Sequence, residues 1–221
     1  MIRMRAVTVL LVVSLGAGCV STHPERAYYA SPSSPHSALL SQTLYRAART
    51  TGDDPARYSF AMIRTRDVSA YAADDAVFYF SEGLANQPPA HVDALVAHEV
   101  AHELLGHAGR RAALSLSLSA GFTVLGVVIP GASLVDLLVN PLVIRAFTRD
   151  QEIAADLKAA DVLRAMGYEA PRRTLAAALR AAAAINGPPA GGFLATEPTL
   201  AERLSALEPL EPERTAKSTD R

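Results

Sequence analysis

The sequence predicts a mostly helical α+β domain that contains one small β-sheet. Apolar residues recur at helical spacing in several segments, as is typical of amphipathic helices. Between residues 58 and 80 the pattern shortens to runs rich in aromatic and branched side chains, which favours two or three strands. Hydrophobic residues make up 50% of the 221 residues, which is enough for one domain with a substantial core but not for two.

The charges of the chain are balanced. It has 21 basic and 22 acidic residues, mixed along the sequence, and a net charge of −1. No part of the chain therefore offers the positive field that attracts nucleic acid or an anionic membrane surface. We expect no nucleic-acid partner.

The N-terminus has the pattern of an export signal. Residues 1–18 combine a basic start with a short apolar stretch and a small-residue exit. The stretch is shorter than the roughly 20 residues of a spanning helix, which favours a cleaved signal peptide over an uncleaved anchor. Cys19 is the only cysteine, so it cannot form an internal disulfide.

The residues before Cys19 suggest another role for it. G-A-G-C resembles a bacterial lipobox, although Gly16 stands where leucine is usual. We expect lipid attached to Cys19 to anchor the protein to the membrane, at the periplasmic face of the outer membrane. A soluble periplasmic protein is the alternative.

The exported chain divides into a tether, a domain and a tail. Residues 19–37 are rich in Ser and Pro and predict a flexible tether. The domain should span residues 38–207, and residues 208–221 lack core-forming content, which indicates a disordered tail. Helices are expected over the ranges 37–50, 90–108, 148–167 and 172–185, with a last one opening at Pro198.

Residues 112–147 are the most apolar part of the exported chain. Two short buried helices are favoured, because polar residues such as Asp136 and Asn140 would be costly in lipid. A membrane-dipping hairpin is the alternative. The alternation L-S-L-S-L-S at residues 114–119 fits a strand as well as a helix.

The stretch H-E-V-A-H at residues 98–102 carries the clearest chemical signal. On a helix, His98 and His102 lie on one face, one turn apart, so both imidazoles can reach one ion, and Glu99 lies beside them. In the H-E-x-x-H signature, zinc polarises a carbonyl and acidifies a water whose proton the Glu accepts. The alternative is a histidine pair that is hydrogen-bonded within the core.

Two more residues follow the signature on the same segment. His107 lies about 140° further round the helix than His102, so it cannot bind the same ion from a regular helix. We expect His107 to cap the helix end or to contact a ligand from outside. Glu103 is expected to be a surface charge or an outer contact of the site.

A third ligand must come from elsewhere, and the downstream helix offers Glu152 with Asp156 one turn further on. Glu152 could complete a His, His, Glu set with an open position, and Asp156 could accept the other N–H of a ligating imidazole. An ordinary solvated acidic face is the alternative, because Asp150 and Asp161 lie on the same helix.

Three blocks extend this signal. They are V-S-A-Y-A-A-D-D-A-V-F-Y-F-S-E-G-L (68–84), which leads into the H-E-x-x-H helix, F-T-R-D-Q-E-I-A-A-D (147–156) and T-E-P-T-L-A-E-R-L (196–204). Together they resemble the HtpX-like and CAAX-prenyl-protease-like zinc metallopeptidases, most closely their small soluble or lipoprotein members of the bacterial envelope.

The resemblance implies a gluzincin-type zinc endopeptidase. Its zincin-type domain would pack a small, edge-exposed β-sheet on the active-site helix. The ligands of one zinc per chain would be His98, His102 and Glu152, and Glu99 would be the general base.

The resemblance also implies how substrate binds. An extended polypeptide would add to the sheet edge along Val77, Phe78 and Tyr79, a mode in which backbone hydrogen bonds give affinity with little sequence preference. Unfolded or damaged envelope proteins would then be natural substrates.

The chain departs from the family pattern in two places. Glu197 stands where the closing motif usually has His, and Ser69 stands where Asn is more frequent. Arg203 keeps its place and would pair either with an acidic neighbour or with a reaction oxyanion.

Two other functions compete with the peptidase. One is a non-cleaving, chaperone-like lipoprotein that keeps the fold and the groove. The intact Glu99 argues against it, because a binding module needs no general base. The other is a helical structural lipoprotein in which His98 and His102 are core residues.

Overall fold

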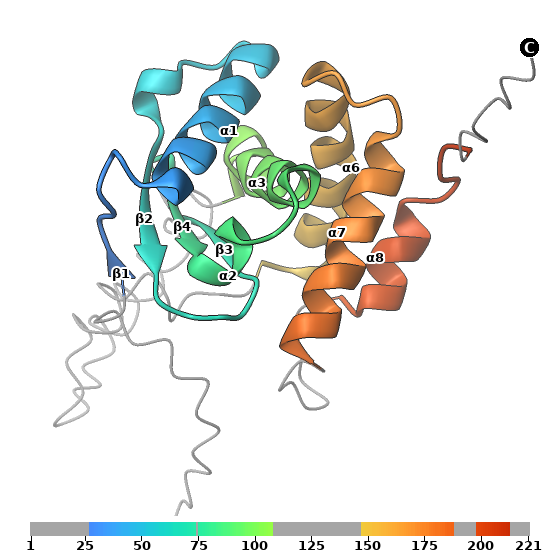
Figure 1. Ribbon diagram of the computed structural model, residues 1–221. Helices are drawn as coiled ribbons and strands as arrows, with labels where there is room; N and C mark the ends of the chain where they lie inside the picture. The colour runs from blue at the N-terminus through green and yellow to red at the C-terminus, as the bar shows by residue number, and fades with distance from the viewer. Residues whose placement is uncertain (1–26, 74, 108–146, 188–197, 213–221) are drawn as a thin grey trace, which may run out of the picture.

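The computed structural model describes residues 27–73, 75–107, 147–187 and 198–212, and it confirms the α+β fold class. A small sheet lies on one side of the domain, α3 occupies the centre, and α6, α7 and α8 lie on the other side (Figure 1). The elements, in chain order, are β1 (Ala27–Tyr28), α1 (Pro35–Thr51), the 3-10 turn η2 (Pro55–Arg57), β2 (Ser59–Ile63), β3 (Ala70–Ala73), β4 (Val77–Ser81), α2 (Glu82–Ala85), α3 (Pro89–Leu104), α6 (Arg149–Ala165), α7 (Pro171–Asn186) and α8 (Leu200–Ala206).

Local signals explain where the helices of the site begin. Thr148 is the N-cap of α6, and Thr199 is the N-cap of α8. The hydroxyl of each threonine accepts a hydrogen bond from the backbone N–H of the residue three positions later. Gln151 and Glu202 return the bond to the cap residue, so both helices start with a capping box. These caps fix the residues at which α6 and α8 begin.

The sheet has four strands in the order β1-β2-β4-β3. β4 pairs in parallel with β2 on one side and antiparallel with β3 on the other. The predicted substrate strand at Val77, Phe78 and Tyr79 is therefore wrong, because both sides of β4 are already paired. In the described part of the chain the edge beside α3 is β3.

The backbone of Ala70 and Ala72 lies on the side of β3 that is turned away from β4. The Ser81 N–H donates to the Ser69 carbonyl at 3.0 Å, which makes these two residues a hydrogen-bonded pair of the β3–β4 ladder. Such pairs alternate with non-bonded pairs along antiparallel strands. Ala70 and Ala72, one and three residues after Ser69, therefore turn their N–H and C=O groups away from β4.

Helix α3 is buried along most of its length, and it contacts α1, α6, α7 and β3. Its apolar residues at 0% exposure are Val92, Ala94, Val96, Ala97, Val100 and Ala101. It also buries four polar residues, Asp93, His98, Glu99 and His102. Asp93 accepts hydrogen bonds from the hydroxyls of Thr43 at 2.8 Å and Tyr168 at 2.5 Å, and it pairs with Arg46. The other three belong to the candidate site.

The ordered domain extends beyond residues 38–207 at both ends. Strand β1, inside the predicted tether, pairs with β2, and α1 begins at Pro35. At the other end, the Glu211 carboxylate accepts the N–H groups of Arg172 at 3.1 Å and Arg173 at 2.9 Å, in the first turn of α7. Both predicted boundaries are wrong because these segments are held by backbone pairing and helix capping, which composition does not reveal.

Several predictions lie outside the described residues. They concern the signal peptide, Cys19, Glu197 and the apolar region up to residue 146. Among the helices that the structure describes, none is both long enough and apolar enough to cross a membrane.

Candidate metal centre

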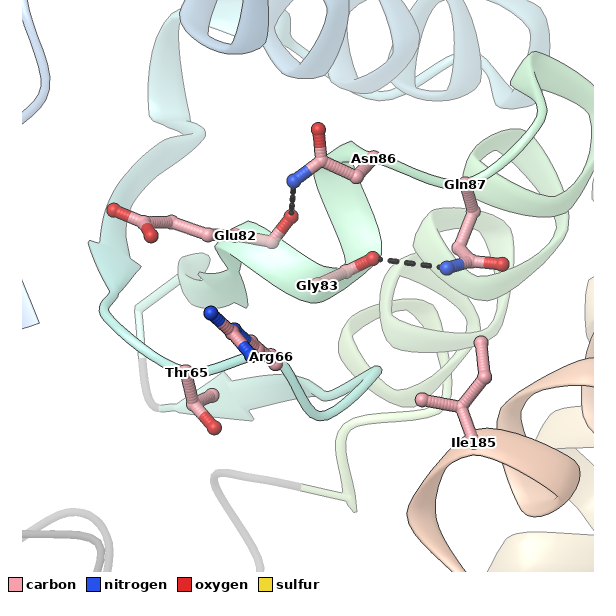
Figure 2. Close-up of a pocket in the computed structure, with 7 residues that line it drawn as sticks. All are labelled: Thr65, Arg66, Glu82, Gly83, Asn86, Gln87 and Ile185. Carbon is pink, nitrogen blue, oxygen red and sulfur yellow. Dashed lines mark hydrogen bonds between the residues drawn. The ribbon is translucent and has the colours of Figure 1, made fainter.

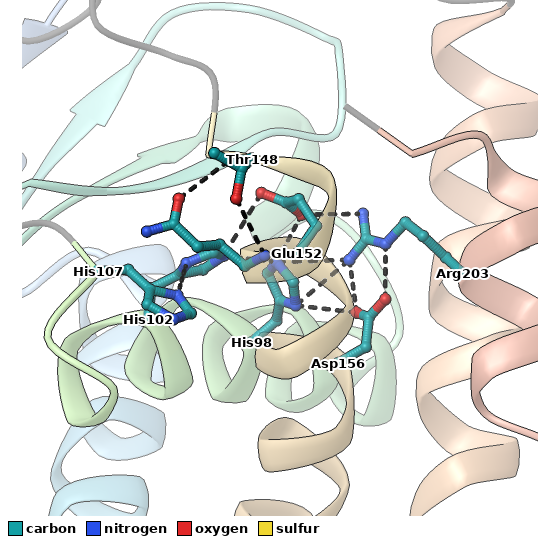
Figure 3. Close-up of polar contacts among 8 residues, drawn as sticks. His98, His102, His107, Thr148, Glu152, Asp156 and Arg203 are labelled. Atoms are coloured by element: carbon teal, nitrogen blue, oxygen red, sulfur yellow. Dashed lines mark hydrogen bonds and ion pairs between the residues drawn. The ribbon is translucent and has the colours of Figure 1, made fainter. Parts of the chain in front are cut away.

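Three potential ligands from two helices converge on one point (Figure 3). His98 and His102 project from α3, and Glu152 projects from the first turn of α6. The two Nε2 atoms are 3.1 Å apart, and oxygens of Glu152 lie 3.3 Å from His98 Nε2 and 3.5 Å from His102 Nε2. The side chains are largely buried, at 7%, 1% and 13% exposure respectively.

These separations fit a tetrahedral metal ion. Ligand atoms about 2.0–2.1 Å from a tetrahedral zinc are about 3.3 Å from one another. The two Nε2 atoms are 3.1 Å apart, close to this value, and Glu152 places one oxygen 3.3 Å from His98 Nε2 and its other oxygen 3.5 Å from His102 Nε2. The predicted grouping of His98, His102 and Glu152 is thus present, with the donor atoms that a divalent metal accepts.

The opposite nitrogen of each histidine is already engaged. His98 Nδ1 lies 3.0 Å from an oxygen of fully buried Asp156, and His102 Nδ1 lies 3.0 Å from His107 Nδ1. When Nδ1–H donates outward to these partners, each neutral ring keeps its lone pair on Nε2, where a metal can bind. Asp156 and His107 therefore orient the two imidazoles.

His107 reaches His102 because α3 ends before it. Leu105 caps the helix, and Gly106 adopts the left-handed conformation with φ 64°. The chain then turns back, so His107 is not carried round the helix as a regular α-helix would require. This explains how His107 contacts a ligand from outside, the second of the two roles expected for it.

Phe147 is a residue of the site that the sequence did not reveal. Its ring stacks on the His102 imidazole, with centroids 3.8 Å apart and planes 17° apart. It directly precedes the Thr148 cap of α6. An aromatic residue at the end of a long apolar region carries no signal for such a contact, so only the fold shows it.

Arg203 of α8 covers the two acidic residues of α6. It donates from Nε and Nη2 to the two oxygens of Asp156 at 2.8 and 2.6 Å, and its Nη1 lies 3.7 Å from Glu152. A bidentate pair of this kind is among the stronger charge-assisted contacts in proteins. The sequence suggested either an acidic neighbour or a reaction oxyanion as the partner of Arg203. In the structure Arg203 pairs with an acidic neighbour, Asp156.

The charged residues of the cluster shift one another's pKa values. Burial tends to lower the pKa of His98, but its contacts with Asp156 and Glu152 outweigh burial and raise that pKa to about 9. Burial also opposes the ionisation of Glu152 and Asp156, yet contacts with His98 and Arg203 lower both pKa values. Without a metal, the cluster is therefore a protonated His98 between two carboxylates.

Glu99 lies beside the cluster, on the side of the sheet edge. Burial raises the pKa of its carboxyl to about 7, and the backbone of Ala72 donates a hydrogen bond to it. Its exposure is 7%. Glu99 therefore combines two properties of a general base, a pKa near neutrality and a position next to the candidate ligands His98 and Glu152.

A separate pocket of about 350 Å³ lies at the loop before β3 (Figure 2). Its polar groups already serve the local backbone, since the amides of Asn86 and Gln87 donate to the carbonyls of Glu82 and Gly83 at 2.8 and 3.1 Å. The residues that line the pocket are Thr65, Arg66, Glu82, Gly83, Asn86, Gln87 and Ile185.

Gly83 allows close contact between α2 and this loop. A Cβ at Gly83 would lie 2.2 Å from the Arg66 carbonyl, so no other residue fits without a shift of the backbone. The loop before β3 is therefore packed tightly against α2 beside this pocket.

Comparison with known proteins agrees with this geometry. The family model of peptidase family M48 matches residues 36–211. This range contains the three candidate ligands, Glu99, Arg203, and both strands of the β3–β4 hairpin. No curated protein matches the chain. Members of this family are metal-dependent peptidases, and the resemblance noted from the sequence is confirmed. The chain belongs to peptidase family M48.

Proposed function

We propose that the protein is a zinc-dependent endopeptidase that cleaves unfolded or extended polypeptides. The observation that supports this most strongly is the convergence of His98, His102 and Glu152 at separations of 3.1–3.5 Å, with the buried carboxyl of Glu99 beside them. His, His and Glu with an open position is the ligand set of catalytic zinc in many peptidases.

Each residue of the cluster has a distinct task in peptide hydrolysis. When bound, zinc polarises the scissile carbonyl and lowers the pKa of the attacking water. Glu99 accepts the proton of that water and then delivers it to the leaving nitrogen. Asp156 and His107 keep the two imidazoles in the tautomer and orientation that ligation needs. Arg203 offsets the charge of the buried Asp156 carboxylate.

We place the substrate on β3 rather than on β4. The N–H and C=O groups of Ala70 face away from β4, so an extended polypeptide can pair with them. Contacts made to the backbone depend little on the side chains of the substrate, which favours unfolded chains over a defined sequence. Ala72 also donates to Glu99, so this edge passes directly beside the proposed base.

Cleavage of an unfolded protein tests the proposal. The zinc-loaded chain should cut reduced, carboxymethylated lactalbumin, and a chelator should stop the cutting until zinc is restored. A chain that binds one zinc and this substrate without cutting it would instead be the non-cleaving, chaperone-like protein. A folded chain that takes up no zinc would make His98 and His102 packing residues.

Zinc binding should release a proton. The pKa of His98 is raised to about 9, so the imidazole is protonated at neutral pH and must lose that proton to ligate. As pH falls below this pKa, protons compete with zinc, and apparent affinity should fall by up to about tenfold per pH unit. Calorimetric titrations in two buffers with different ionisation heats measure the released protons. An affinity that stays constant between about pH 7 and 8.5 would contradict the raised pKa.

We also propose that the protein acts on envelope proteins from a lipid anchor on Cys19. The basic start, the apolar stretch and G-A-G-C support this assignment. Labelled palmitate should enter the full-length protein in a bacterial host and should not enter a Cys19→Ser variant. Equal labelling of both, or release of the wild type from membranes without detergent, would leave the soluble periplasmic alternative.

A further inference from the structure

Both backbone groups of Val68 are bound by the side chain of a residue 118 positions later in the sequence. The Val68 N–H donates to Oδ1 of Asn186 at 2.8 Å, and Nδ2 of Asn186 donates to the Val68 carbonyl at 2.9 Å. Two such bonds between one pair of residues are the pattern of a hydrogen-bonded pair in an antiparallel ladder. The amide of Asn186 therefore takes the place of one residue of a neighbouring strand.

The side of Val68 that Asn186 occupies is the outer side of the sheet. Ser69, the next residue, directs both of its backbone groups toward Ser81. Its carbonyl accepts the Ser81 N–H at 3.0 Å, and its N–H donates to the Ser81 hydroxyl at 2.9 Å. Because the backbone groups of successive residues in a strand point to opposite sides, those of Val68 and Ala70 point away from β4. Val68 and Ala70 are thus consecutive positions for a strand added to this edge, and Asn186 fills the first of them.

Val68 is also the last position to which the edge extends in this direction. The chain bends at residues 66 and 67, directly before it. The carbonyls of Arg66 and Asp67 lie against Gly83 of α2, where an added Cβ would be 2.2 and 2.4 Å from them. This packing fixes the bend, so the edge ends at Val68.

Helix α7 holds Asn186 in place. Asn186 is the last residue of α7, which stops at Gly187 with φ 74° and packs against α3. Ile185 lines the pocket beside the loop before β3, which places the end of α7 against that loop (Figure 2). Asn186 is exposed, so a chain in solution that approached Val68 would meet this amide first.

We propose that Asn186 sets the end of the substrate-binding edge, so that a bound polypeptide pairs with Ala70 but not with Val68. The inference rests on the proposed function, because it assigns to β3 the role of substrate edge. Substrate residues beyond the one opposite Ala70 receive no backbone hydrogen bonds at this end, so they add little affinity. Asn186 thereby limits the length of extended chain that the enzyme recognises on this side.

Peptides of increasing length test this limit with the zinc-loaded full chain. A labelled peptide with one cleavage site is lengthened in single residues at either end, because the direction of the bound chain decides which end lies beside Val68. In the wild type, KM should stop falling at a defined length at each end. In Asn186→Ala, two further residues at one end should lower KM about threefold or more, the effect of one or two net hydrogen bonds. Arg180→Ala, a change at an exposed residue of the same helix, should behave as wild type.

Hydrogen exchange of the Val68 amide tests the contact without cleavage. In the absence of peptide, this amide should exchange at least tenfold faster in Asn186→Ala than in wild type, with exchange in α3 and α6 unchanged as the control for folding. A long peptide should slow it again in the variant only.

The proposal is overturned if KM depends on peptide length in the same way in both proteins. It is also overturned if a long peptide leaves the Val68 amide of the variant unprotected. If the wild type binds the peptides without cutting them, the peptidase assignment falls, and the exchange data still decide whether Asn186 ends the edge.

Discussion

A Glu99→Gln variant should lose peptidase activity while it keeps its metal. Removing a positioned general base typically costs about 10²–10⁴-fold in rate. Glutamine has nearly the same shape as glutamate and can still accept the Ala72 hydrogen bond, but it cannot take up the proton of the attacking water. We therefore expect kcat to fall within that range and KM to change little. Single-turnover cleavage of a labelled unfolded protein measures the effect.

The folded stability of this variant is its internal control. Burial raises the pKa of Glu99 to about 7, above the ordinary value for Glu, so the folded state favours the protonated form. That preference stabilises the fold at acid pH and is lost as pH rises through about 7. The neutral glutamine should therefore melt no lower than wild type at pH 8. Equal cleavage by the variant, at full zinc occupancy, would rule out Glu99 as the base.

A Glu152→Ala variant should lose most of its zinc affinity. The substitution removes one of three ligand atoms and leaves His98 and His102 as a pair. Losing a residue that only orients a ligand typically costs about 10–100-fold in metal affinity, so Asp156→Asn should fall in that range and Glu152→Ala beyond it. Competition with a chromophoric chelator at constant pH measures all three proteins on one scale.

Asp161 supplies the matched control on the same helix. Its side chain is 63% exposed and pairs with Arg164 within α6, so Asp161→Ala removes an acid without touching the cluster. We expect wild-type affinity from it. If Glu152→Ala and Asp161→Ala bind zinc equally well, the acidic residues of α6 form only a solvated face, and the third ligand lies elsewhere.

The sequence predicted the site better than it predicted the sheet. Helical spacing alone places His98 and His102 on one face, and the same rule places Glu152 above Asp156. These relations are local, so they survive folding unchanged. The order of strands in the sheet is not a local property: β4, the last strand in the sequence, lies between β2 and β3. The apolar pattern of a strand does not indicate which strands it will pair with.

The contacts around the ligands were predicted only in part, for a similar reason. His107 was placed on a continuing helix, whereas left-handed Gly106 ends α3 and turns His107 toward His102. The glycine was a visible signal for this turn. Nothing in the sequence predicted the stacking of Phe147 on His102, because this contact joins segments whose approach depends on the whole fold.

The contact between Arg203 and Asp156 sets an order of assembly. The two histidines, Glu152 and Asp156 all precede α8 in the chain, so a chain still emerging from the ribosome has the ligands but not this arginine. Until α8 docks, the two acids of α6 have His98 but not Arg203 as a positive partner, so burying both carboxylates is less favourable. The contacts around the ligands are therefore complete only after α8 has docked.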